Sequence, residues 1–264
     1  SRRRHTRSLC DWSSDVCSSD LVNSRNSGSP CSQWLKGIGL ARGDFIWIAE
    51  SDDSCASDFL SHLIPRLEEG AALAYCRSAA IDADGVDISA TTLYWPDQRD
   101  DTLWHQPFRL SSQDFCLRLM SCSNCIPNAS AVVFRCETAL ACFEIQDRIA
   151  HLLYCGDWLF WFHYLAHQNG VICFDPQPRS HFRCHGATTR AKRGSRQQQA
   201  RHIAEYCQAV AWIQAHPLLA GSRPWRHRLR DGLWDWMLLE YIERLRSEEH
   251  TSELQSHSDL VCRL

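Results

Sequence analysis

The sequence lacks the features that mark a membrane-spanning or nucleic-acid-binding protein. No apolar run in its interior approaches the ~20 residues that a membrane-spanning helix requires. An excess of charge of one sign is also missing, because 28 Lys and Arg residues stand against 31 Asp and Glu residues, for a net charge of −3. A chain with this balance has no basic surplus for a polyanion. We therefore expect no nucleic-acid partner and a cytoplasmic protein, with association at a membrane surface left open.

Closely spaced cysteine pairs are scarce, although the chain has 15 cysteines. The one close pair, Cys122 and Cys125 in "CSNC", has no second pair to complete a structural zinc site. A site that adds Cys116 and Cys136 is one alternative, and disulfides are another. We favour reduced thiols packed as small core residues. The cysteines with apolar neighbours are Cys76, Cys116, Cys142, Cys173 and Cys207.

Both ends of the chain read as translated DNA of another origin. "RSEEHTSELQS" (246–256) back-translates to a sequencing-library adapter, and "DWSSDVCSSDL" (11–21) back-translates to its reverse complement. We predict that residues 1–21 and about 246–264 are artefacts with few buried contacts, to be left out of fold reasoning. The alternative is a pair of polar low-complexity tails. The native part is then 22–245, an internal fragment of a longer protein.

Alternating strand and helix patterns in the first half predict an α/β fold with a mostly parallel sheet. "FIWIA" (45–49) has the apolar character of a strand that is covered on both faces. It lies between a helix over 31–43 and a second helix that Ser57 caps and Gly70 ends. A strand then leads to a turn at Asp84–Gly85.

The second half predicts further elements of both kinds. Residues 95–113 are polar and irregular, which favours a loop. The remaining segments are a helix over 112–121, a strand and helix over 129–139, an apolar helix over 156–170 that starts at Asp157, a strand with a Pro-rich loop over 171–186, and helical sequence from Gln197 onward.

Three carboxylates follow the strand over 45–49. Glu50, Asp52 and Asp53 repel one another and are costly to remove from water, so a cation among them would stabilise the group. Their place at the carboxyl end of a strand is where open α/β sheets bind ligands. The alternative is that they cap the helix that follows.

Four motifs in order resemble those of family 2 glycosyltransferases with the GT-A fold. The motifs are "NSGSPCSQWLKGIGLARGDFIWIAESDD" (26–53), "CIPNASAVVFR" (125–135), "GDWLFW" (156–161) and "HFRCHGATT" (181–189). The resemblance covers nearly all of 23–190. It implies a GT-A domain over 22–190 that lacks its first strand–helix–strand unit, followed by a helical extension over 191–245.

The resemblance also implies an activity. The implied enzyme is inverting, metal-dependent and hexosyltransferase-like. It moves a sugar from a nucleotide-sugar donor to a hydroxyl of a glycan or lipid-linked acceptor in polysaccharide synthesis. The implied cofactor is Mg²⁺ or Mn²⁺, which neutralises the leaving diphosphate. The fragment itself is expected to be inactive, because the missing unit holds the nucleotide base.

The resemblance assigns the carboxylates to the donor side and to catalysis. Asp52 is the expected direct metal ligand, and Glu50 and Asp53 are expected to bind the donor. Asp157 is the expected base that takes the proton from the acceptor hydroxyl. A carboxylate at this place would also suit the first turn of the helix over 158–169, and the two roles are compatible. We expect the Asp52 and Asp157 carboxylates to lie roughly 7–12 Å apart, by analogy with the spaced carboxylates of inverting glycosidases.

Four further residues receive roles from the resemblance. Arg183 would bind the diphosphate and His185 would add a metal ligand, against the alternative of an ordinary surface loop. Trp158 and Asn128 would bind the acceptor, and for Trp158 the alternative is core packing.

Other functions remain open. A non-catalytic sugar-nucleotide or polysaccharide-binding module of the same fold is the main alternative, and a nucleotidyltransferase also uses acids at a strand end. The basic segment 189–202 could cover the diphosphate or an anionic lipid, although a solvated loop is the simpler interpretation. The Trp- and Arg-rich helix over 223–246 could touch a membrane interface, although packing on a missing domain is the simpler interpretation.

Overall fold

The computed structural model describes residues 27–92, 94–98, 100, 102–121, 123–184 and 196–220. The two predicted artefact segments lie outside these residues, and so do His185, the first half of the basic segment (189–195) and the helix predicted over 223–246. Their predictions are therefore not tested here.

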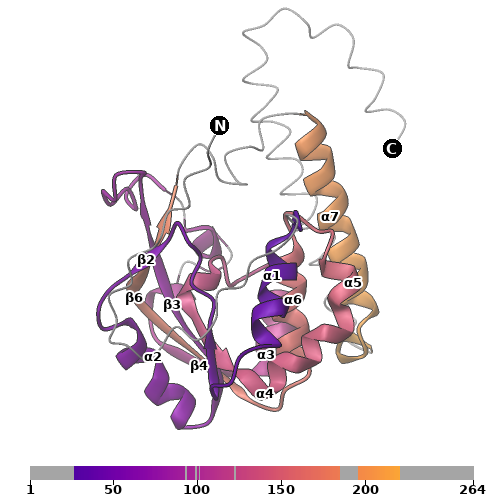
Figure 1. Cartoon of the computed structure of the whole chain (residues 1–264), viewed down its shortest axis with the longest axis horizontal. Coiled ribbons are helices and arrows are strands. Elements are labelled where there is room, and N and C mark those ends of the chain that lie inside the picture. The colour runs from indigo at the N-terminus through magenta and orange to yellow at the C-terminus, as the bar shows by residue number, and fades with distance from the viewer. Residues whose placement is uncertain are drawn as a thin grey trace, which may run out of the picture.

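The described chain forms one six-stranded sheet with helices on both faces (Figure 1). The helices are α1 (Pro30–Ile38), α2 (Phe59–Glu68), α3 (Ser112–Phe115), α4 (Cys136–Ala139), α5 (Gln146–Ile149), α6 (Gly156–Ala166) and α7 (Arg196–Ala215). The strands are β1 (Phe45–Trp47), β2 (Ser54–Cys55), β3 (Ala71–Ile81), β4 (Phe108–Ser111), β5 (Val132–Arg135) and β6 (Val171–Arg183). The α/β fold class predicted from the sequence is confirmed.

The strand order is β1-β5-β3-β6-β2, with β4 added beside β6. Among the strand pairs of the described residues, only β3 and β6 are parallel, so the expectation of a mostly parallel sheet was wrong. β1 and β3 do run in the same direction, but β5 lies between them and is antiparallel to both, so that Val133 faces Trp47 on one side and Ala74 on the other. The local pattern could not show this insertion, because strand pairing joins segments far apart in sequence.

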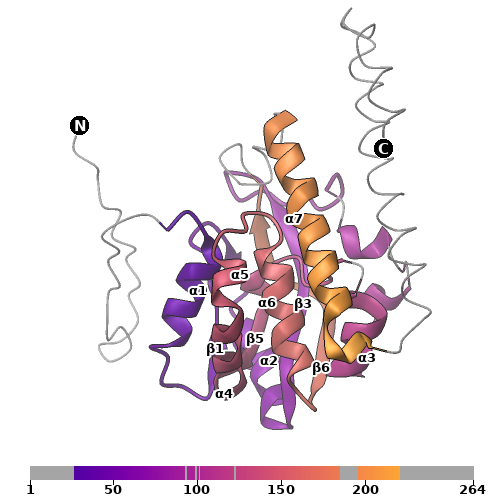
Figure 2. The ribbon, with the colours of Figure 1, turned by 90° about the vertical axis from the view of Figure 1, so that its right-hand side faces the viewer.

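The two faces of the sheet are covered unequally. On one face, α2 packs its buried side chains Phe59, Leu63 and Leu67 against β3 and β5. On the other face lies the main core, to which α1, α3, α5 and α6 contribute, while α7 packs along the outside of α6 (Figure 2). The sheet therefore separates a thin layer from a thick one.

Helix α6 is the central element of the thick layer. Eight consecutive residues from Trp158 to Leu165 are buried, as expected of a helix that is apolar all round. Phe134 of β5 meets Trp161 edge to face, with ring centroids 5.2 Å apart. The predicted start of this helix at Asp157 is confirmed to within one residue, since α6 begins at Gly156.

Several local predictions were wrong. The polar stretch 95–113 contains β4, which pairs with β6 between Phe108 and Phe174. The strand predicted before the Pro-rich loop continues through it, because the prolines lie in a bulge between Asp175 and Ser180 where β3 offers only one opposing residue. The cap of α2 is Asp58 and not Ser57.

The cysteine prediction holds in the described residues with one exception. All cysteines there are free, and most are buried. Cys207 is exposed on α7, so its expected core position was wrong. None of the described helices combines the length and the apolarity needed to cross a membrane.

Candidate active site

The acidic loop lies directly after β1, and Ser130 fixes it from a neighbouring segment. The backbone N–H of Glu50 donates to the Ser130 hydroxyl at 3.0 Å, and the Trp47 indole donates to the Ser130 carbonyl at 2.9 Å. The amide of Asp53 then bonds back to the carbonyl of Glu50 at 3.2 Å, which closes a turn. Ser130 therefore sets the position of the acids relative to β5.

Arg183, at the end of β6, holds the same loop from the other side. Its backbone N–H donates to Oδ1 of Asp53 at 3.0 Å, and its Nε donates to the carbonyl of Asp52 at 2.8 Å. Its Nη1 donates to the carbonyls of Asp82 and Ala83 at 2.8 and 3.0 Å. The guanidinium therefore clamps two loops together, which leaves Nη2 as the part of it that can serve a phosphate.

Asp157 occupies the first turn of α6, where the helix dipole favours a carboxylate. Its Oδ2 accepts a 2.9 Å hydrogen bond from the side-chain amide of Asn124. Its Oδ1 accepts from the backbone N–H of Trp158 at 2.7 Å. The carboxylate is thus oriented by two donors, from two segments of the chain.

The acids from β1 and α6 influence one another electrostatically. Burial raises the pKa of Glu50 to about 7, and the negative charges of Asp53, Asp52 and Asp157 add to this effect. The charge of Asp157 therefore reaches Glu50, although the two residues are 107 positions apart in the sequence. The predicted Asp52–Asp157 separation itself stays a prediction.

The donor set fits a divalent cation. Burial also raises the pKa of Asp53, against the effect of the bond from the Arg183 amide. Within the described residues, Oδ2 of Asp53 is buried and has no hydrogen-bond partner. A buried oxygen of this kind beside two other carboxylates matches the hard oxygen ligands that Mg²⁺ and Mn²⁺ prefer. The residues present therefore fit the implied metal.

Asn128 and Trp158 lie in different environments. Asn128 is buried, accepts from the Ser130 amide at 3.0 Å and donates to the Ser180 hydroxyl at 3.2 Å. It also lines a pocket. Trp158 is 2% exposed, and its indole donates to the Met120 carbonyl at 2.8 Å. The structure therefore places Trp158 in the core, which is the packing alternative.

The pocket beside Asn128 has a mixed wall, in which apolar surface outweighs a smaller set of polar groups. Arg77 stands at its side, with its guanidinium 4.2 Å from the centroid of the Tyr94 ring and paired with Asp97. The other residues that line the pocket are Ser78, Ala79, Ala80, Asp87, Ser89, Thr92, Pro127, Pro178 and Phe182. Hydroxyls, a carboxylate and a ring face are groups suited to binding a sugar.

Sequence reasoning missed the residues that hold these groups in place. Ser130 and Asn124 fall within or beside a quoted motif, so their segment was found but their roles were not. No sequence motif pointed to Glu205 of α7. Its side chain is buried, and its carboxylate accepts hydrogen bonds from the backbone amides of Leu153 and Tyr154 at 2.9 and 2.6 Å. These amides belong to the turn that leads into α6 and Asp157.

The turn before Asp157 also depends on a glycine. A Cβ atom at Gly156 would lie 2.7 Å from Sγ of Cys31 in α1, closer than real Cβ contacts allow. The absence of a side chain at Gly156 thus lets α1 approach the beginning of α6. Only the packing of two distant segments shows this requirement.

Residues 8–127 match the family model for glycosyl transferase family 2. Over this segment the chain is similar to members of glycosyl transferase family 2. The match includes the acidic loop at 50–53 and ends before Asp157. The fold is accordingly that of a GT-A glycosyltransferase, with a mixed sheet and flanking helices.

Solved structures with a similar chain path include one described as the crystal structure of S. aureus TarS 1-349. The two share 12% sequence identity with a TM-score of 0.45, and the similarity covers 80% of this chain and 70% of that one. No curated protein sequence matches this chain significantly.

Proposed function

We propose that the full-length parent of this chain is an inverting, metal-dependent glycosyltransferase. It would transfer a sugar from a nucleotide-sugar donor to a hydroxyl of a glycan or lipid-linked acceptor during polysaccharide synthesis. The observation that supports the proposal is that the charge of Asp157, in the first turn of α6, contributes to the raised pKa of Glu50, which follows β1. Such a transfer requires carboxylates in two roles around one cleft, one to hold the cation and one to act as the base.

The first role is to hold the cation. Asp52 is the proposed direct ligand, and Glu50 and Asp53 would serve metal-bound water or the donor. A bound Mg²⁺ or Mn²⁺ supplies Lewis-acid neutralisation of the diphosphate as it leaves. The structure supports this role through the buried, unpartnered Oδ2 of Asp53. Arg183 keeps the loop in place and can offer Nη2 to a phosphate oxygen, and His185 would add a further ligand.

The second role is that of the base. Asp157 would accept the proton of the acceptor hydroxyl, whose oxygen then forms a bond to the anomeric carbon while the bond to the diphosphate breaks. Attack from the face opposite the leaving group inverts the configuration. Asn124 supports the role because its bond to Oδ2 fixes the direction in which the carboxylate points. The acceptor would lie in the pocket that Asn128 lines.

The test uses the complete open reading frame with the predicted adapter segments removed. Release of nucleoside diphosphate from a panel of nucleotide sugars would be measured with Mn²⁺ or Mg²⁺ for the parent enzyme, Asp52→Ala and Asp157→Asn. We expect both variants to fold and to lose at least about a hundredfold in rate, since removal of a general base costs about 10²–10⁴-fold. Near-normal transfer by Asp157→Asn would place the base elsewhere. Donor binding without turnover in the parent enzyme would support the non-catalytic module.

A further inference from the structure

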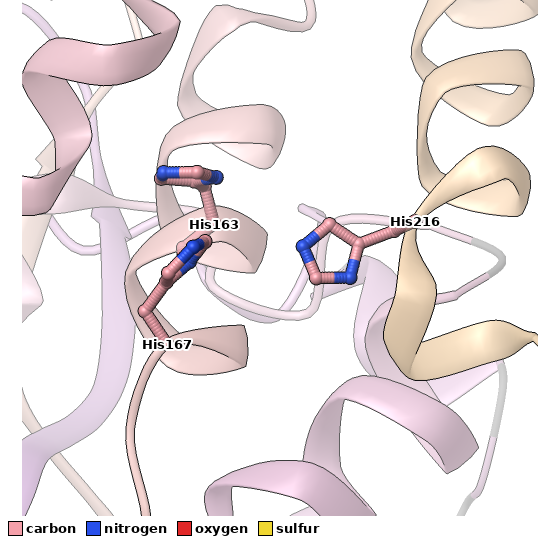
Figure 3. Close-up of side chains that lie close together, drawn as sticks. All are labelled: His163, His167 and His216. Carbon is pink, nitrogen blue, oxygen red and sulfur yellow. The ribbon is translucent and has the colours of Figure 1, made fainter.

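Three histidines come together at the far end of α6, where the chain that leaves α7 returns to it (Figure 3). His163 and His167 are one helical turn apart, and His216 approaches them from the turn after α7. One ring nitrogen from each residue lies within 4.8 Å of those of the other two. Because an α-helix rises 1.5 Å per residue, His163 lies about 9 Å along α6 from Asp157 and His167 lies about 15 Å along it.

The backbone engages one nitrogen of each ring and leaves the other for the cluster. Nε2 of His163 lies 3.2 Å from the Ala141 carbonyl, and Nδ1 of His167 lies 2.9 Å from the His163 carbonyl. A carbonyl can only accept, so both of these nitrogens carry the proton and the opposite nitrogens, Nδ1 of His163 and Nε2 of His167, have free lone pairs. Metal-binding histidines are typically held by bonds of this type.

Nδ1 of His163 is the most informative atom of the three rings. The residue is 4% exposed, and this nitrogen is buried without a hydrogen-bond partner within the described part of the chain. A buried polar atom without a partner is unfavourable unless something satisfies it. Trp212 closes one side of the cluster, with its ring centroid 5.7 Å from those of both His163 and His216. The cluster thus combines a buried imidazole nitrogen that lacks a partner with two further imidazoles nearby.

We propose that His163, His167 and His216 form a binding site for one divalent transition-metal ion that prefers imidazole, with Zn²⁺ as the best fit. Two histidines at i and i+4 on one helix face are a known zinc-binding arrangement. Three imidazoles and a fourth, open position match the ligand number that Zn²⁺ accepts. These imidazole nitrogen ligands differ from the carboxylate oxygens at 50–53, which suit Mg²⁺ or Mn²⁺.

His216 must adjust for the ion to bind. The Leu218 amide donates to its Nδ1 at 3.2 Å, which puts the proton of the neutral ring on Nε2. Coordination through Nε2 moves that proton to Nδ1 and gives up the Leu218 bond. Zn–N bonds of about 2.0–2.1 Å also require the three nitrogens to close to about 3.3 Å of one another. The rings of His163 and His167, whose centroids are 4.0 Å apart, must rotate for this to happen. His216 is therefore the weakest of the three ligands.

The ion would cross-link two elements that are otherwise joined covalently only through the main chain. His163 and His167 belong to α6 and its end, whereas His216 lies between α7 and the 3₁₀ turn Pro217–Leu219. Its coordination would pin the C-terminal end of α7 to α6. The expected role is thus a clip that stabilises the docking of α7, and this role does not depend on the proposed transferase activity.

The test measures zinc binding by the whole chain after treatment with a chelator. Zinc stoichiometry, affinity against a competing dye and the cobalt absorption spectrum would be recorded for wild type, His167→Gln, His216→Gln and the control His151→Gln, whose histidine is exposed and lies outside the cluster. Other cysteines and histidines could bind zinc, so the difference between variants is the readout. His163→Gln is omitted because loss of its buried ring could unfold the chain.

We expect wild type and His151→Gln to bind one more equivalent of zinc than the two cluster variants, or to bind it at least about tenfold more tightly. Zinc should raise the melting temperature of wild type, His151→Gln and Asp52→Asn, but not that of the two cluster variants. The proposal is overturned if His167→Gln and His216→Gln bind zinc as His151→Gln does. It is also overturned if Asp52→Asn abolishes the zinc effect.

Discussion

The side-chain amide of Asn124 donates a 2.9 Å hydrogen bond to Oδ2 of Asp157. The carbonyl oxygen of the same side chain accepts the Ile126 amide at 2.9 Å, so Asn124 is itself fixed in direction. A loop residue thereby controls where a carboxylate on α6 points. Because the bond is directional, its loss would disturb the proposed base without removing it.

The variant Asn124→Asp tests this relationship in the full-length enzyme. The new side chain keeps an oxygen for the Ile126 amide but sets a second carboxylate against Asp157, which should raise the pKa of the base. We expect the acidic limb of the pH–rate profile to move to higher pH by about one unit or more, with a loss of activity at neutral pH. Gln113→Glu, at an exposed position of α3, is a matched control for the added charge. An unchanged profile in Asn124→Asp would show that Asp157 is not the titrating base.

Glu50 makes stability depend on pH in the metal-free chain. Its pKa is raised from 4.5 to about 7, first by burial and then by the neighbouring carboxylates. The folded state then binds the proton more tightly than the unfolded state. The contribution of protonated Glu50 to stability is therefore fully present below about pH 4.5 and is lost as the pH rises through 7. At about pH 8 the ionised Glu50 should cost about 3 kcal/mol.

Glu50→Gln should remove most of this dependence. We expect its free energy of unfolding in chelator to exceed that of wild type by about 3 kcal/mol at about pH 8 and to approach it near about pH 4.5. Urea unfolding at the two pH values is the measurement. Equal stabilities of the two proteins at the higher pH would contradict the coupling between these acids.

Gly156→Ala should destabilise the junction of α1 and α6. The new Cβ would lie 2.7 Å from Sγ of Cys31, and overpacking of this kind costs about 1–3 kcal/mol. Gly37→Ala in α1 is the matched control, because nothing lies within 4 Å of its Cβ and it should be neutral or stabilising by up to about 1 kcal/mol. Denaturant midpoints compare the two.

The pair Gly156 and Cys31 can also be tested together. Cys31→Ala removes the sulfur atom, so the double variant should lose less stability than the two single variants together. Strict additivity would mean that the contact with Cys31 is not the cause.

Glu205→Gln should loosen the turn before α6. The carboxylate accepts amides from Leu153 and Tyr154 and pairs with Arg201 at 2.9 Å. Gln offers one acceptor oxygen and turns an NH₂ group toward these donors, which should cost about 3 kcal/mol because a buried partner is lost. Glu144→Gln, whose side chain is 69% exposed, should change stability by less than about 0.5 kcal/mol. Hydrogen exchange would report the turn directly, and unchanged protection of the Leu153 and Tyr154 amides would refute the role.

Local sequence patterns predicted the elements whose conformation depends mainly on their own residues. The apolar run from Phe45, the glycine at 70 with φ of +97° and the wholly apolar helix from Trp158 were each located correctly. The acids at 50–53 were recognised because their repulsion is evident from their spacing alone. In contrast, β4 was missed, because its polar residues face outward and its stability comes from pairing with β6.

By itself, the sequence determined the α/β class, the family resemblance and the residue types of the candidate site, since these follow from local periodicity and from motifs within short segments. Only the tertiary structure decided that β5 lies between β1 and β3, and that Ser130, Asn124 and Glu205 hold the carboxylates in place. It likewise decided that His216 joins His163 and His167. The physical reason is that hydrogen bonds and packing contacts between segments depend on distances in space, which local pattern does not encode.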